Sequence, residues 1–216
     1  MKYNAIIFDL DGTLLNSLED IRDSVNEILD RYHYPQRSLE QIRSFVGNGA
    51  INLIRRALPE GISEQEVEKC LQEYSNYYYE HSRHKTCPYH GIVSLLEQLK
   101  EKGFKLGVVS NKDEATVKDL CESYFPSLLS VVVGDSKGYQ KKPAPDNIMR
   151  AISQLQTEKE ATLYVGDSEV DIETARNCAL DSVLVSWGFR EREVLLQKGA
   201  KVIIDCPDEL AGYLGL

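Results

Sequence analysis

Hydrophobic and polar residues follow two different rhythms along the chain, and each rhythm predicts a different kind of structure. Short continuous apolar runs, typical of strands that are buried on both faces, occur near the N-terminus and again beyond residue 100. The runs expected as strands are residues 5–8, 104–110, 131–133, 161–165, 182–185 and 201–204. Helical spacing fills most of the intervals, at residues 92–102, 114–123, 146–155 and 170–178. This alternation predicts an α/β fold: a doubly wound parallel sheet with right-handed crossovers and helices on both faces.

A long block after the first strand contains helical patterns only. Ser17 is expected to cap a helix that runs to about Tyr32, and Ser38 and Ser63 begin later helices at 38–45 and from 63 onward, with another at 50–58. No strand pattern occurs between residues 16 and 82. We therefore expect an inserted all-helical cap domain at 16–82 and a catalytic core formed by 1–15 and 83–216.

Composition narrows the class of protein. The chain has 216 residues, of which 42% are hydrophobic and 27% charged, as in ordinary globular proteins. Its net charge of -9 disfavours nucleic acid and anionic membranes as partners. Five scattered cysteines indicate reduced thiols. The first strand begins at Ala5, which leaves no room for a signal peptide, and no apolar run reaches membrane-spanning length. We expect a cytoplasmic protein.

Two carboxylates follow the first apolar run directly. Asp9 and Asp11 lie where the strand ends, and Gly12 forms a turn. Ligands of open α/β sheets bind beyond the carboxyl ends of the strands. A pair of acids there can seat a hard divalent cation, or supply a nucleophile and a proton carrier. The plainer alternative is a strand that ends in a solvated Asp-Gly turn.

Three later segments place similar chemistry at other strand ends. They are Ser110-Asn111, Lys141-Lys142-Pro143, and Gly166-Asp167-Ser168 with Asp171 one helical turn on. Each has an ordinary explanation by itself: helix capping, a solvated loop charge, or acids that favour a helix N-terminus. Together they put carboxylates, a hydroxyl and a lysine at four strand ends of one parallel sheet. The ordinary explanations would require four coincidences.

These four segments resemble the motifs of the haloacid dehalogenase superfamily of phosphohydrolases. The match consists of Asp9 to Thr13, Ser110-Asn111, Lys142-Pro143, and Gly166 to Ser168 with Asp171, in the family's order and over essentially the whole chain. The resemblance implies the family's Rossmann-like core with a C1-type helical cap. It also implies a Mg²⁺-dependent phosphatase of small phosphomonoesters that works through an aspartyl-phosphate.

The resemblance also implies a role for each matched residue. Asp9 is the expected nucleophile, and Asp11 protonates the leaving group and then deprotonates water. The Asp9 carboxylate, the Asp11 carbonyl and Asp167 would hold Mg²⁺, while Asp171 supports these ligands from behind. The phosphoryl group would be bound and neutralised by the remaining residues, which are Ser110, Lys142, the backbone N–H groups of Leu10 and Asn111, and Thr13 in the turn that it orients.

One segment of the helical block resembles the cap of phosphoglycolate phosphatases. Gly47, Asn48 and Gly49 would turn backbone N–H groups toward a small anion, and Arg56 would complement a carboxylate. The alternative is a helix-breaking turn with a surface arginine. Ser186-Trp187-Gly188-Phe189 also resembles that branch, whereas Val133-Gly134-Asp135 lacks a second glycine that the branch often has.

Several functions fit these motifs. The leading hypothesis is a phosphoglycolate phosphatase-like hydrolase that takes a small-molecule phosphate ester as its partner. A sugar phosphomutase similar to β-phosphoglucomutase and an inorganic pyrophosphatase are alternatives on the same core. A phosphate-binding regulator is the alternative outside enzymes. Intact Asp9, Asp11, Lys142 and Asp167 argue against the regulator, because a pure binder needs no paired nucleophile and acid.

Overall fold

The computed structural model describes residues 2–216 and divides the chain into two compact units. The core unit consists of the chain up to Asn16 together with Pro88–Leu216, and the helical unit is Ser17–Cys87. Two short strands, β2 (Leu15–Asn16) and β3 (Cys87–Pro88), form a sheet of their own where the chain passes from one unit to the other. The sequence pattern did not predict them, because two residues are too few to show a periodicity.

A parallel six-stranded sheet forms the centre of the core unit, with strand order β5-β4-β1-β6-β7-β8. The strands are β1 (Ala5–Phe8), β4 (Lys105–Asp113), β5 (Val131–Asp135), β6 (Thr162–Gly166), β7 (Asp181–Val185) and β8 (Ile203–Ile204). β1 is buried along its whole length between β4 and β6, as its uninterrupted apolar run predicted. The observed sheet confirms the predicted α/β fold.

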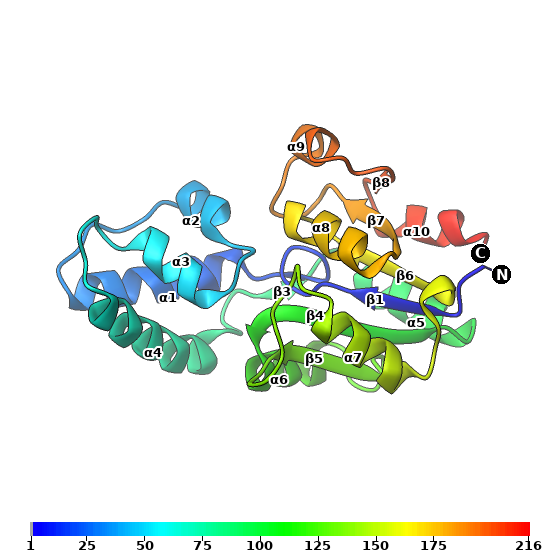
Figure 1. Ribbon diagram of the computed structural model, residues 1–216, viewed down its shortest axis with the longest axis horizontal. Helices are drawn as coiled ribbons and strands as arrows, with labels where there is room; N and C mark the ends of the chain where they lie inside the picture. Colours follow the sequence, from blue (N-terminus) through cyan, green and yellow to red (C-terminus); the bar gives the residue numbers. More distant parts are fainter. Residues whose placement is uncertain (1) are drawn as a thin grey trace. The chain divides into compact units, whose positions relative to one another are not determined.

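Helices cover both faces of this sheet (Figure 1). They are α5 (Ile92–Glu101), α6 (Glu114–Tyr124), α7 (Asp146–Leu155), α8 (Glu169–Cys178), α9 (Arg192–Gln197) and α10 (Pro207–Leu214), with a 3-10 turn at Lys159–Ala161. Side chains of α5, α6 and α10 share one apolar cluster with the sheet, and those of α7 and α8 share another. The sheet is therefore covered on two sides, and its carboxyl edge is where side chains of different strands converge.

The helical unit contains α1 (Leu18–Arg31), α2 (Leu39–Phe45), α3 (Ala50–Ala57) and α4 (Glu64–His81). Each buries one apolar stripe, represented by Ile28, Ile42, Ile54 and Tyr74. No helix in residues 2–216 is both long and apolar enough to cross a membrane.

Serine caps two of these helices as predicted, but not the first. Ser38 forms a reciprocal capping box with Gln41, and the Ser63 hydroxyl accepts a hydrogen bond from the Glu66 N–H group. The capping bond expected from Ser17 is absent. Ser17 is buried with φ -105° and ψ 2°, outside the extended conformation from which an N-cap side chain reaches the first turn.

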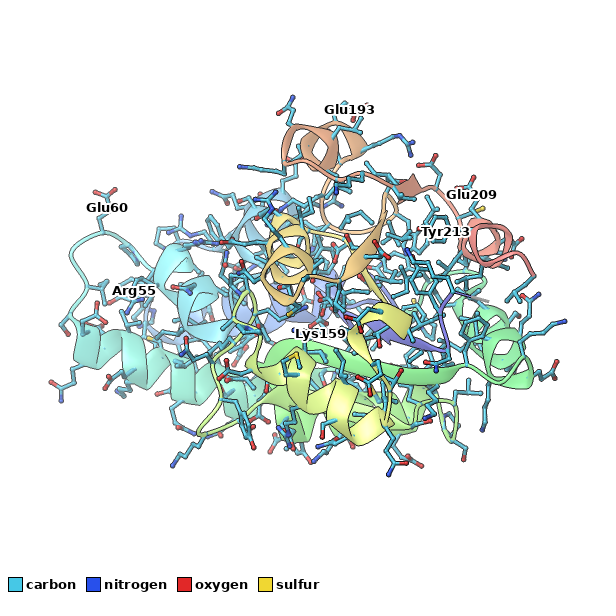
Figure 2. All side chains as sticks on the ribbon, turned by 45° about the vertical axis from the view of Figure 1, so that its right-hand side comes forward. Arg55, Glu60, Lys159, Glu193, Glu209 and Tyr213 are labelled. Atoms are coloured by element: carbon cyan, nitrogen blue, oxygen red, sulfur yellow. The ribbon has the colours of Figure 1, made fainter. Side chains whose placement is uncertain are left out.

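Charged side chains on the outer helices and loops point into solvent. Figure 2 shows Glu60, Glu193 and Glu209 directed outward from the ribbon, and all three are exposed. Against this background, three buried charged residues of the core unit stand out: Lys142, Asp167 and Asp171 are 4%, 1% and 0% exposed. Burial of charge costs free energy unless each group is paired and hydrogen-bonded. These three residues therefore indicate a candidate functional site.

Candidate active site

The carboxyl edge of the sheet brings the four sequence motifs together. Phe8 is in register with Val108 of β4 and with Val165 of β6, so the residues that follow these strands are neighbours. The Asp9 N–H group continues the ladder and donates to the Val165 carbonyl at 2.8 Å. Figure 1 shows the three strands side by side. All contacts described below, except where the helical unit is named, lie within the core unit.

The ammonium group of Lys142 contacts two of the predicted acids, and each of its N–H bonds has a partner. Its Nζ lies 2.9 Å from an oxygen of Asp9 and 2.9 Å from an oxygen of Asp171, and donates to the Tyr164 hydroxyl at 3.0 Å. Three partners account for all three N–H bonds of an ammonium. Burial alone would lower the pKa of Lys142, but the charges of Asp171 and Asp9 raise it above its usual value. Lys142 is therefore a fixed positive charge beside the expected nucleophile.

The side chain of Asn111 holds the backbone of Lys142. Its Oδ1 accepts from the Lys142 N–H group at 2.8 Å, and its Nδ2 donates to the Lys142 carbonyl at 2.9 Å. The sequence motif predicted only a backbone N–H role for Asn111. The two residues are far apart in the chain, and no local pattern signals such a reciprocal clasp. It anchors the loop that carries Lys142 to the end of β4.

Asp171 is held by hydrogen bonds on both carboxylate oxygens. Oδ1 accepts from Lys142 and from the Tyr164 hydroxyl at 2.7 Å, and Oδ2 accepts from the N–H groups of Asp167 and Ser168 and from the Ser168 hydroxyl. Burial would raise the pKa of Asp171, but Lys142 and these donors hold it below its usual range. Gly166 leaves room for the carboxylate, since a Cβ there would come within 2.4 Å of Asp171. This geometry agrees with a supporting role.

Asp167 lies between two glycines that press against its carboxylate. A Cβ on Gly12, where φ is +85°, would come within 2.3 Å of Asp167 Oδ2, and one on Gly188 within 2.4 Å of Asp167 Cβ. The Phe189 N–H group donates to Asp167 Oδ2 at 2.7 Å, and the Thr13 hydroxyl donates to Oδ1 at 3.3 Å. Burial, with the charges of Asp171 and Asp9, raises the pKa of Asp167 well above its usual value.

The loop after β7 braces this side of the site. The Trp187 indole donates to the Thr13 carbonyl at 3.1 Å. Arg190 pairs with Glu169 through two N–H groups, at 2.8 and 3.1 Å. The Ser186–Phe189 segment resembles the phosphoglycolate phosphatase branch, but that resemblance predicted no site role for it. The sequence does place a glycine, Gly188, between two aromatic residues just after a strand. The structure explains this glycine, because a side chain there would collide with Asp167.

The carboxylates fit a hard divalent cation. One oxygen from each of Asp9, Asp167 and Asp171 lies within 4.8 Å of the others; Asp167 and Asp171 are buried, and the side chain of Asp9 is 14% exposed. Burial raises the pKa of Asp9 to about 7; Lys142 opposes the rise and Asp171 adds to it. One ammonium beside three carboxylates leaves excess negative charge, which a cation with oxygen ligands would offset. Asp171 accepts five hydrogen bonds, whereas Asp167 accepts two, so Asp9 and Asp167 are the better candidate ligands.

Asp11, the expected acid, pairs with a lysine that no sequence motif predicted as part of the site. Lys112 donates from Nζ to Asp11 Oδ1 at 2.6 Å. The neighbouring Ser110 hydroxyl oxygen accepts from the Lys112 N–H group at 3.2 Å. The Leu10 N–H group donates to the Asp9 carboxylate at 2.7 Å. Leu10 is thus hydrogen-bonded to the expected nucleophile, Asp9, and Ser110 lies in β4, the strand that pairs with β1.

The candidates in the helical unit have a different environment. Gly47 and Gly49 have φ angles of +119° and +80°, and Gly49 precedes α3. The Asn48 carbonyl accepts from Asn52 at 2.8 Å. Arg56 is exposed and donates to the Phe45 carbonyl at 2.9 Å. These residues form one local turn, held by backbone contacts within the helical unit.

Comparison with known proteins places this arrangement in a family. Residues 6–185 match the family model for haloacid dehalogenase-like hydrolases. The chain is 30% identical to phosphoglycolate phosphatase 1 of Pseudomonas aeruginosa, over 95% of this chain and 80% of the relative. It is also 30% identical to pyrophosphatase PpaX of Bacillus mycoides, over 99% and 98%. A crystal structure from Lactobacillus delbrueckii subsp. bulgaricus, provisionally assigned as a phosphoglycolate phosphatase, covers 99% of both chains with a TM-score of 0.93 and 33% identity.

Proposed function

The chain belongs to the haloacid dehalogenase-like hydrolases and is a phosphatase, and we propose that it is Mg²⁺-dependent and hydrolyses small anionic phosphomonoesters. Phosphoglycolate is the first candidate substrate, because several relatives carry that activity in their names. The observation that carries the proposal is the buried contact between Asp9 and Lys142, next to the Asp167 and Asp171 carboxylates and with the Asp11 carboxylate at the same edge.

Lys142 and the metal ligands would reduce the repulsion between the substrate and the attacking carboxylate. A phosphomonoester dianion repels an approaching carboxylate, so the phosphoryl charge must be neutralised before Asp9 can attack. The Lys142 ammonium, 2.9 Å from Asp9, supplies one positive charge in a buried setting. A bound Mg²⁺, held by Asp9, Asp167 and the Asp11 carbonyl, would supply the rest of that neutralisation. The Ser110 hydroxyl and the N–H groups of the same edge would donate to phosphoryl oxygens.

Asp9 and Asp11 then divide the chemistry. An Asp9 oxygen attacks phosphorus, the bond from phosphorus to the ester oxygen breaks, and Asp11 gives its proton to the departing oxygen. Water next attacks the phosphorus of the aspartyl-phosphate and gives a proton back to Asp11. The bond between phosphorus and Asp9 breaks, so inorganic phosphate leaves and both carboxylates return to their starting states.

A second candidate substrate is inorganic pyrophosphate. The match to pyrophosphatase PpaX covers 99% of this chain and 98% of the relative, so the similarity extends over both the core unit and the helical unit. The same core would attack one phosphoryl group while the other departs. A sugar phosphomutase would require the aspartyl-phosphate to survive until a second substrate arrives.

The remaining assignments are part of the same proposal. Residues 16–82 act as a cap domain, in which Gly47, Asn48, Gly49 and Arg56 select a small carboxylated substrate. Cytoplasm is the proposed compartment, because each of the five cysteines is a free thiol. The partner is a small-molecule phosphate ester rather than nucleic acid or membrane, in keeping with the net charge of -9.

Steady-state phosphate release tests the proposed function. Wild type is assayed with Mg²⁺ on phosphoglycolate, pyrophosphate and several sugar phosphates, with EDTA and the Asp9→Asn variant as controls. We expect Mg²⁺-dependent release that is fastest with phosphoglycolate and absent in both controls. Isomerised sugar phosphate without net phosphate release would identify a mutase. A folded wild type that releases phosphate from none of the substrates would contradict the proposal and favour a phosphate-binding regulator.

A further inference from the structure

Lys112 is a second lysine at the active edge, and the mechanism above gives it no task. Its Nζ lies 2.6 Å from Asp11 Oδ1, and the two side chains are only 11% and 15% exposed. The residue lies near the end of β4, within the segment where the β4–β5 register shifts. The sheet therefore carries one cation at the nucleophile, Lys142, and another at the expected acid.

The two lysines differ in what surrounds them. Lys142 is fully enclosed and has its three N–H bonds directed at Asp9, Asp171 and Tyr164. Lys112 lies closer to solvent and meets the carboxylate that has to reach the leaving group.

Distances set what the Lys112 ammonium can reach. Asp11 must come within about 3 Å of the ester oxygen to protonate it. With Nζ 2.6 Å from Asp11 Oδ1, the ammonium then lies no more than about 8 Å from the ester oxygen, whichever carboxylate oxygen carries the proton. In phosphoglycolate a single methylene separates the ester oxygen from the carboxylate, and in pyrophosphate the second phosphoryl group is bonded to the departing oxygen directly. Both anionic groups fall inside this radius.

We propose that Lys112 binds the negative group that the leaving group carries next to the scissile bond. It would thereby select phosphate compounds with an anionic leaving group, either a carboxylate or a phosphoryl group. The inference rests on the proposed phosphatase function and deepens it. Lys112 belongs to the core unit that carries the chemistry, whereas Arg56 is an exposed residue of the helical unit that donates to the Phe45 carbonyl. Selection for charge would then come from Lys112 of the core unit as well as from Arg56.

A matched pair of substrates tests the role of Lys112. Phosphoglycolate and its carboxamide have nearly the same shape and differ in one negative charge on the leaving group. The variant Lys112→Met removes the ammonium and keeps most of the stem. We expect the ratio of kcat/KM for phosphoglycolate to that for the carboxamide to fall by about 10–100-fold, as for loss of one charged hydrogen bond. Pyrophosphate against phenyl phosphate gives the same test for a phosphoryl group.

Two further variants separate charge recognition from structural effects. Lys112→Arg keeps the charge and should restore most of the ratio. Lys118→Met serves as the control, because Lys118 is an exposed lysine that also pairs with a carboxylate, Glu114, at 2.6 Å. We expect wild-type ratios for it. A ratio that falls for only one of the two substrate pairs supports the proposal and identifies the anion as carboxylate or phosphoryl.

Other outcomes would overturn the inference or the function, and the two can be told apart. If Lys112→Met slows phosphoglycolate and its carboxamide by the same factor, and pyrophosphate and phenyl phosphate likewise, Lys112 acts by positioning Asp11 and the inference is wrong, while the phosphatase stands. If Lys112→Arg leaves the selectivity as low as Lys112→Met does, charge is not what Lys112 contributes. If folded wild type hydrolyses none of the four compounds, the proposed function itself fails.

Discussion

The core unit and the helical unit hold their candidate residues in opposite ways. In the core unit, Lys142 and Asp171 are buried, and every polar atom of their side chains meets a partner. In the helical unit, Arg56 is exposed, and the Gly47–Gly49 turn is held through its backbone. Buried charges are costly and persist where their surroundings fix them. An exposed cation such as Arg56 loses little solvation free energy, and it interacts only with groups that reach the surface of the protein.

This contrast predicts two kinds of mutational effect. Changes in the buried group of Lys142, Asp167 and Asp171 should impair every substrate and also alter stability or metal binding. Changes in the helical unit should alter the choice of substrate and leave the fold nearly untouched.

Asp167→Ala and Asp171→Ala should both be severely impaired, for different reasons. Asp167→Ala loses a proposed metal ligand, so its Mg²⁺ requirement should rise far more than the roughly 10–100-fold expected for Asp171→Ala. Asp171→Ala leaves the buried Lys142 short of a partner, so its free energy of unfolding should fall by about 3–5 kcal/mol. Mg²⁺-dependent kinetics and urea unfolding in EDTA measure the two effects.

The free energy of unfolding should distinguish Asp167 from Asp171, because the two substitutions are expected to change it differently. The folded state raises the pKa of Asp167 well above its usual value, so its ionised form destabilises the metal-free protein at neutral pH. Asp167→Ala should therefore be no less stable than wild type in EDTA. A large loss of stability in Asp167→Ala, or none in Asp171→Ala, would mean that the two roles are exchanged.

Gly188→Ala should weaken metal binding without removing any ligand. The added Cβ would come within 2.4 Å of Asp167 Cβ and of the Gly12 carbonyl, so the Asp167 carboxylate must shift. We expect Mg²⁺ affinity to fall by about 10–100-fold, measured by calorimetric titration and by fluorescence of Trp187, the single tryptophan of the chain. Gly212→Ala is the matched control, because a Cβ there meets nothing within 4 Å. Unchanged affinity in Gly188→Ala would show that the loop does not position Asp167.

Arg56→Ala tests the other side of the comparison. If Arg56 meets the substrate carboxylate, kcat/KM for phosphoglycolate should fall by about 10–100-fold, while a neutral aryl phosphate should be barely affected. Urea unfolding should match wild type, because the side chain is exposed. An equal fall for both substrates would mean that Arg56 acts through the structure of the helical unit. Equal rates for wild type and variant would leave selection to the core.

An ion pair of the core unit that lies outside the site should show only a small effect. Arg150 donates to both oxygens of Glu114, at 2.7 and 3.2 Å, and together with Lys118 lowers the pKa of Glu114 from 4.5 to about 2. The stabilisation is present above pH 4.5 and is lost as the pH falls toward 2. Wild type should exceed Glu114→Gln by about 1 kcal/mol in free energy of unfolding at pH 7, and by much less near pH 2.5. A constant difference across this range would contradict the assignment.

The sequence predicted the strands and the convergence of the four motifs because both follow local rules. A buried strand such as β1 requires an apolar run, and the carboxyl ends of parallel strands meet at one edge. The same rules placed Asp9, Ser110 and Asp167 at that edge. They also predicted the capping boundaries at Ser38 and Ser63, since an N-cap depends on residues three positions away.

The contacts that hold the site could not be predicted in this way, because they join residues far apart in the chain. The Asn111 clasp on Lys142 spans 31 residues, the Tyr164–Lys142 bond 22, and the Lys112–Asp11 pair 101. Tyr164 fitted an apolar strand pattern, which gave no indication that its hydroxyl contacts Lys142 and Asp171. Such contacts depend on loop paths and side-chain directions that sequence periodicity does not encode.

The central claim is that Asp9 becomes phosphorylated, and rapid acid quenching of a single turnover tests it most directly. Wild type with Mg²⁺ is mixed with radiolabelled phosphoglycolate, quenched in acid within one turnover and digested with trypsin. The account predicts a label that is stable in acid and released by hydroxylamine, on the peptide of residues 3–22, with fragmentation assigning it to Asp9. Phosphate released without any labelled protein during that turnover, or a label on another residue, would contradict it.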